Sequence, residues 1–97
     1  MFIKLFRRWR ERRAVIRALD RLDREIARVT QSKDDLERHL TWLRDQQRRP
    51  DAPASLEHSE RAVRQHLFYI DTRLDELKQR RIAIRHDGHR VIPWWLR

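Results

Sequence analysis

An unbroken alternation of three- and four-residue steps between apolar side chains constrains this chain more than any other feature. Nine positions follow these steps, and eight of them are apolar: Val15, Leu19, Leu22, Ile26, Val29, Lys33, Leu36, Leu40 and Leu43. Such a repeat places one apolar seam along an α-helix and is typical of coiled coils. We therefore expect a helix over residues 15–48 that packs against a second helix.

The same spacing returns after a short interruption. Seven of the next nine seam positions are apolar: Leu56, Glu60, Val63, Leu67, Ile70, Leu74, Leu77, Arg81 and Ile84. Two prolines within residues 49–55 stop the first helix, and Ser55 can cap the second helix, with Glu57 in its first turn. The pattern predicts an all-α fold, an antiparallel two-helix coiled-coil hairpin with its second helix over residues 56–87. Such a hairpin can dimerise to a four-helix bundle.

Two basic residues interrupt the seams, one in each helix, and they bear on the register of the hairpin. Folding about the turn pairs positions whose numbers sum to about 103, so that apolar seam positions face each other over most of the length. Lys33 then lies opposite Ile70, and Arg81 lies opposite Leu22. Each charged head either extends past the edge of the seam or fixes the register at some cost in stability.

A polar stretch in the middle of the first helix allows an alternative. Ser32 and Asp35 stand three residues apart, as in a capping box, and could begin a new helix there. The heptad phase passes through this stretch without a shift. We therefore expect one continuous helix.

The net positive charge is concentrated at the two ends of the sequence. Residues 1–13 carry a net charge of +5, residues 78–97 carry +5, and the residues between them carry −1. An antiparallel hairpin would bring the two ends together. Because the first helix is longer, residues 1–14 should overhang the second helix, with Phe2, Leu5, Phe6 and Trp9 on one face.

The last segment, residues 88–97, should leave the second helix as an extended tail. Gly88 is the only glycine and stands where a left-handed helix C-cap is expected, and Pro93 prevents the helix from resuming. Turned back over the overhang, the tail would place Trp94 and Trp95 on Phe6 and Trp9. Alternatively, the two tryptophans remain exposed as anchors for a partner.

Two groups of residues are candidate binding surfaces within this single domain. The first, named here the basic pole, combines arginines and large aromatic rings: Phe2, Phe6, Arg7, Arg8, Trp9, Arg10, Arg12, Arg13, Arg85, Arg90, Trp94, Trp95 and Arg97. The second lies outside both seams and comprises Trp42, Phe68, Tyr69 and Ile82. A two-helix hairpin buries only one stripe, so we expect this second apolar interface to be covered by a dimer partner or by a larger protein.

Catalytic signatures are absent from the sequence. There is no cysteine and only one glycine, which excludes catalytic thiols and glycine-rich phosphate loops. His86 and His89 straddle a helix end, where histidine is favoured by the helix dipole, so we expect no metal and no cofactor. The chain is therefore predicted to be non-enzymatic, with no small-molecule substrate.

No apolar run is long enough to span a bilayer, and no signal-peptide core follows the basic start. We expect a protein that is neither secreted nor transmembrane. It would be cytoplasmic, or located within a virion if phage-encoded, since Arg-rich helical hairpins of this size are frequent among phage accessory proteins and bacterial assembly factors.

Three functions remain, and each uses the basic pole. In the first, the chain is an interaction or assembly protein whose pole and exposed apolar face dock onto a larger protein complex. In the second, the pole binds nucleic acid without sequence specificity, through phosphate contacts and base stacking. In the third, its aromatic face lies on an anionic membrane. The first explains the pole and the second apolar interface together, and is therefore preferred.

Overall fold

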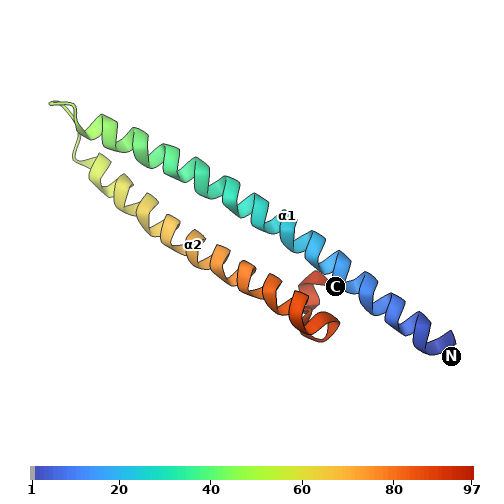
Figure 1. Cartoon of the computed structure of the whole chain (residues 1–97). Coiled ribbons are helices and arrows are strands. Elements are labelled where there is room, and N and C mark those ends of the chain that lie inside the picture. The colour runs from blue at the N-terminus through green and yellow to red at the C-terminus, as the bar shows by residue number, and fades with distance from the viewer. Residues whose placement is uncertain (1) are drawn as a thin grey trace. The chain divides into compact units, whose positions relative to one another are not determined.

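The computed structural model describes residues 2–97 and is all-helical over that range, with no strand. Two long helices, α1 (Phe2–Gln47) and α2 (Ser55–Asp87), pack against each other (Figure 1). Two short 3₁₀ helices follow, η1 (Gly88–Val91) and η2 (Trp94–Leu96). The all-α prediction is confirmed.

The heptad repeat identified the packing face of each helix correctly. Every predicted seam position from Val15 to Leu43, and from Leu56 to Ile84, is buried or half-buried. The most deeply buried large side chains, each at most 2% exposed, are Leu22, Leu43, Leu77 and Ile84. Burial of one apolar stripe on each helix is therefore the main source of stability.

The helix α1 continues through the stretch that resembles a capping box. The Ser32 hydroxyl donates a hydrogen bond of 3.2 Å to the carbonyl of Arg28, one turn earlier in the same helix. A serine that bonds back in this way sits within a helix, whereas an N-cap serine accepts a bond from an amide further along. Ser32 therefore begins no new helix.

The chain divides into two compact units, one formed by residues 28–74 and the other by the two flanking stretches, residues 2–27 and 75–97. In the central unit, cross-helix ion pairs join Lys33 to Asp71 at 2.7 Å and Arg44 to Glu60 at 3.1 Å. Residue numbers rise on one helix as they fall on the other, so the two helical segments of this unit run antiparallel.

Glu60 is the acidic residue within the seam of the central unit, and three side chains satisfy its carboxylate. Arg64 and Arg44 donate to Oε1 at 2.7 and 3.1 Å, and Gln47 donates to Oε2 at 2.9 Å. These donors lower the pKa of Glu60, with the Gln47 hydrogen bond as the largest cause and the Arg44 hydrogen bond next. The seam therefore holds Glu60 in its charged form near the turn.

The two cationic seam residues both reach an acid on the facing helix. In the central unit, the hydrogen bond with Asp71 raises the pKa of Lys33 above its usual value of 10.5. In the flanking unit, Arg81 Nε lies 3.1 Å from Asp23 Oδ1, although its geometry makes no hydrogen bond. Their side chains remain 32% and 38% exposed, so each head leaves the seam at its edge and pairs there.

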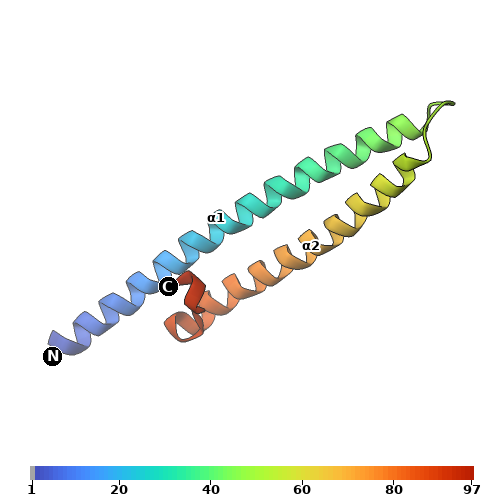
Figure 2. The ribbon, with the colours of Figure 1, turned by 180° about the vertical axis from the view of Figure 1, so that it is seen from behind.

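The tail of the flanking unit is folded, which corrects the expectation of an extended segment. Gly88 has a φ of 75°, in the left-handed region, and α2 ends just before it at Asp87. The two 3₁₀ helices then turn the chain back beside α1 (Figures 1 and 2). Ile92 and Leu96 are thereby buried, at 4% and 2% exposure. An extended tail would leave these two aliphatic side chains in water, so their burial favours the folded tail.

A matched pair of isoleucines on α2 tests the seam. Ile84→Ala should destabilise the fold by about 2–5 kcal/mol, because Ile84 is fully buried. Ile82→Ala, which removes the same atoms from a side chain that is 58% exposed, should cost less than about 0.5 kcal/mol. Urea unfolding followed by circular dichroism at low protein concentration measures both. Equal losses would contradict the assignment of the seam.

The pKa of Glu60 predicts a pH-dependent contribution to stability. Because folding lowers this pKa below its usual value of 4.5, the stabilisation is fully present above 4.5 and is lost as the pH falls through the folded-state value. Glu60→Gln should therefore destabilise the protein at pH 7, and the difference between the two proteins should shrink in acid. Urea unfolding at several pH values checks this, and a difference independent of pH would refute it.

Substitutions of Leu96 and Trp94 test which of these two side chains holds the tail against the rest of the flanking unit. Leu96→Ala should free the tail, because Leu96 is 2% exposed, whereas Trp94→Ala should leave it docked, because Trp94 is 84% exposed. Hydrogen exchange of the Leu96 and Arg97 amides, which donate to the carbonyls of Pro93 and Trp94, reports the docking. Faster exchange in Trp94→Ala than in Leu96→Ala would show that the tryptophan holds the tail.

Candidate interaction surfaces

The first turns of α1 expose an apolar stripe to solvent. Phe2, Leu5, Phe6 and Trp9 are 89%, 64%, 56% and 53% exposed, respectively. Their spacing of three and four residues places them on one side of the helix. Ile16, which is 59% exposed, continues this side two turns later. We name this surface the N-terminal apolar stripe.

Arginine side chains lie against the rings of the N-terminal apolar stripe. Phe6 and Trp9 stack with their ring centroids 5.9 Å apart. The Arg10 guanidinium lies 5.2 Å from the Phe6 ring centroid, and the Arg13 guanidinium lies 4.8 Å from that of Trp9. These cation–π contacts hold positive charge at the border of the apolar surface.

The tail tryptophans occupy different surroundings from the rings of the stripe. Trp95 is half-buried, and its ring lies 5.8 Å from the guanidinium of Arg80 on α2. Trp94 is 84% exposed. One of the two alternatives from the sequence placed both tryptophans on Phe6 and Trp9; in the structure, η2 turns Leu96 inward and the Trp95 ring lies against Arg80 of α2. The two tryptophans therefore differ in exposure, and Trp94 is the one that faces solvent.

The arginines of the basic pole present charge that no carboxylate neutralises. All of those named in the pole are exposed: Arg7, Arg8, Arg10, Arg12, Arg13, Arg85, Arg90 and Arg97. Over residues 2–97, none of these side chains forms an ion pair with an acid. The pole is therefore free to bind an anionic surface without first breaking internal ion pairs.

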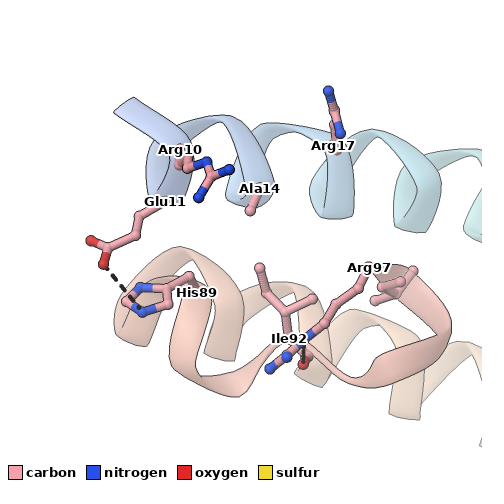
Figure 3. Close-up of a pocket in the computed structure, with 8 residues that line it drawn as sticks. Arg10, Glu11, Ala14, Arg17, His89, Ile92 and Arg97 are labelled. Atoms are coloured by element: carbon pink, nitrogen blue, oxygen red, sulfur yellow. Dashed lines mark hydrogen bonds and ion pairs between the residues drawn. The ribbon is translucent and has the colours of Figure 1, made fainter. Parts of the chain in front are cut away.

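A groove of about 320 Å³ runs between the tail and α1 in the flanking unit (Figure 3). Its lining comprises Arg10, Glu11, Ala14, Arg17, His89, Ile92, Leu96 and Arg97. Figure 3 shows the Ile92 side chain directed toward α1, and Glu11 Oε1 lies 3.6 Å from His89 Nε2 at one end. Arg97 Nε donates to the carbonyl of Ile92, and Arg21 Nη1 donates to the carbonyl of Arg97.

The heptad pattern gave no sign of this groove. Arg17 and Glu11 fall outside the seam, and the groove depends on the fold of the tail, which a heptad repeat does not describe. The two alanines Ala14 and Ala18, one turn apart, are the signal that was available. Small residues at this spacing allow another segment to approach a helix closely, and Ala18 is indeed fully buried.

The residues of the second apolar interface are exposed. In the central unit, Trp42, Phe68 and Tyr69 are 52%, 68% and 61% exposed. Trp42 stacks on His39 with the ring centroids 5.8 Å apart, and Phe68 contacts Tyr69 edge to face at 6.2 Å. Ile82, in the flanking unit, is 58% exposed. Burial of these side chains by a partner remains a prediction.

Two kinds of site are not found in the part of the chain that the structure describes. Within residues 2–97, no three acidic, histidine or cysteine side chains lie together as metal ligands would. In the same range, neither α1 nor α2 contains a stretch that is long and apolar enough to cross a membrane.

Comparison with protein-family models, with curated proteins and with solved structures found no match to this chain.

Proposed function

We propose that the protein is a non-enzymatic interaction or assembly protein that docks onto a larger protein complex and acts in the cytoplasm or in a virion. Its contact surfaces are the basic pole and the exposed apolar helix face of Trp42, Phe68 and Tyr69. The observation that carries the proposal is the exposure of these three rings, each more than half accessible to solvent.

The proposed architecture is an antiparallel coiled-coil hairpin with an N-terminal helical overhang. Dimerisation to a four-helix bundle is one way for such a hairpin to cover the apolar side chains outside its seam. Ion pairs between the helices support the antiparallel register within each unit. Lys33 with Asp71 and Arg44 with Glu60 support it in the central unit, and Asp23 with Arg81 supports it in the flanking unit.

A protein partner accounts for the aromatic side chains as well as the charge. Burying one large apolar side chain contributes roughly 1.5–3 kcal/mol, so three rings supply a substantial part of a binding free energy. Tryptophan, tyrosine and arginine are also the residues most enriched among those that dominate protein interfaces. The unpaired arginines of the pole would then select an acidic site on the partner.

Nucleic acid is the second candidate, and the pole supplies a specific reason for it. Its arginines are exposed and form no internal ion pairs, and Trp94 is 84% exposed. An unpaired base can stack on such a ring while the arginines contact phosphates. This function leaves Trp42, Phe68 and Tyr69 without a role, which is why it ranks second.

Substitution of Phe68 tests the proposed function. The tagged full chain, its Phe68→Asp variant and a Gln65→Asp control are used to recover partners from a host lysate with and without nuclease. Gln65→Asp adds the same charge to the same exposed stretch of α2. We expect a defined protein in the wild-type and control samples, insensitive to nuclease, and reduced at least about tenfold by Phe68→Asp, since one buried ring is worth roughly that factor.

The same variants detect self-association by sedimentation equilibrium. If the second apolar interface forms a dimer, wild type and Gln65→Asp should associate and Phe68→Asp should not. Recovery that depends on nucleic acid, or that is equal in all three proteins, would overturn the proposal.

A further inference from the structure

We infer that residues 2–16 of α1 form an amphipathic helix that lies in the interface of an anionic lipid bilayer. This inference goes beyond the proposed protein docking and does not rest on it, because it does not involve the apolar face of the central unit. It assigns to a lipid surface the part of the basic pole that carries Phe2, Phe6 and Trp9, and it leaves the central unit to a protein partner.

The N-terminal apolar stripe lies on one side of α1 and is exposed to solvent. Phe2, Leu5, Phe6 and Trp9 are each more than half exposed, so the fold leaves their surface in contact with water. Trp9 and Ile16 line one shallow hollow with Arg12 and Arg13, so the stems of two arginines lie between Ile16 and the aromatic part of the stripe. A one-sided apolar stripe bordered by arginines is what an interfacial helix buries among acyl chains.

Positive charge surrounds the N-terminal apolar stripe. Arg10 and Arg13 lie against the rings of Phe6 and Trp9, at the borders of the stripe. Arg12 lies beside Trp9 and Ile16, and the rest of the helix surface carries Lys4, Arg7 and Arg8, with Glu11 as the one acidic residue of the segment. With the stripe facing the acyl chains, the guanidinium groups at its borders stand at the level of the lipid phosphates.

A bilayer fits this combination better than nucleic acid does. Bases stack on aromatic rings, but they offer no comparable contact to the aliphatic side chains of Leu5 and Ile16. A bilayer offers an apolar layer to the whole stripe and an anionic layer to the cations on both of its borders. Tryptophan is also a residue favoured at the boundary between acyl chains and headgroups.

Because the stripe lies outside the core, it can be altered without unfolding the protein. Its residues from Phe2 to Trp9 are exposed, and the buried side chains of the flanking unit begin at Ala18. Substitutions in the stripe should therefore leave the far-UV circular dichroism and the urea midpoint close to those of the wild type.

Vesicle flotation of the full chain tests the inference. The vesicles consist of phosphatidylcholine alone or of phosphatidylcholine with phosphatidylglycerol, in a buffer of physiological ionic strength. We expect the wild type to float with the anionic vesicles and to remain at the bottom with the neutral ones. Phe6→Gln should weaken binding on the order of tenfold, and Leu5→Gln together with Phe6→Gln should abolish it.

Matched variants separate the apolar and the electrostatic contributions. Leu5→Gln and Phe6→Gln leave the net charge unchanged, whereas Arg7→Gln with Arg8→Gln leaves the stripe intact and should weaken binding by reducing attraction to the headgroups. Trp94→Gln and Phe68→Asp alter exposed rings elsewhere and should float like the wild type. Loss of flotation in Phe68→Asp would show that lipid binding uses the central unit, and it would overturn the inference.

Three other results would also overturn it. These are no flotation with anionic vesicles, equal flotation of the wild type and the Leu5→Gln, Phe6→Gln variant, and binding of a single-stranded oligonucleotide that depends on Phe6 in a chain that fails to float. None of these results bears on the Phe68-dependent recovery of a protein partner, so the two proposals can fail separately.

Discussion

The narrow seam between the two helices limits which apolar side chains the fold can bury. Each helix buries only the stripe of its heptad positions, and large apolar side chains at other positions have no place inside the fold. Phe68 and Trp42 in the central unit, and Phe6 and Trp9 in the flanking unit, are exposed for this reason. We propose that partners cover these rings, a protein at the central unit and a lipid surface at the N-terminal apolar stripe.

Charged residues within the seam favour one alignment of the two helices and add little apolar burial. Lys33 pairs with Asp71 and Glu60 is held by Arg44 and Gln47 in the central unit, each across the helix interface. A shift of one helix by a single heptad would separate these partners and leave the seam charges without them, which is costly for the largely buried carboxylate of Glu60. A polar residue at a seam position commonly fixes register in coiled coils, and here the pairing partner can be named for each.

Much of the packing could be predicted from the sequence because a heptad repeat is a property of the helix itself. The buried or half-buried seam positions from Leu22 to Leu43 follow from their spacing alone. Gly88 marks the end of α2 for a local reason, its positive φ. The tail was mispredicted because Pro93 signals only that an α-helix cannot resume. The 3₁₀ turns that bury Leu96 depend on a distant surface of α1, so no local pattern encodes them.

The folded tail also has a consequence for local opening. The seam keeps α2 packed as far as Ile84, so the tail can detach while the seam stays closed. Such an opening loses mainly the burial of Ile92 and Leu96 and the bond from Arg21 to the carbonyl of Arg97. We therefore expect the tail to detach in thermal fluctuations without unfolding of the two helices. Each such opening would bring the apolar side chains of Ile92 and Leu96 into contact with water and would widen access to the side of α1 at Ala14.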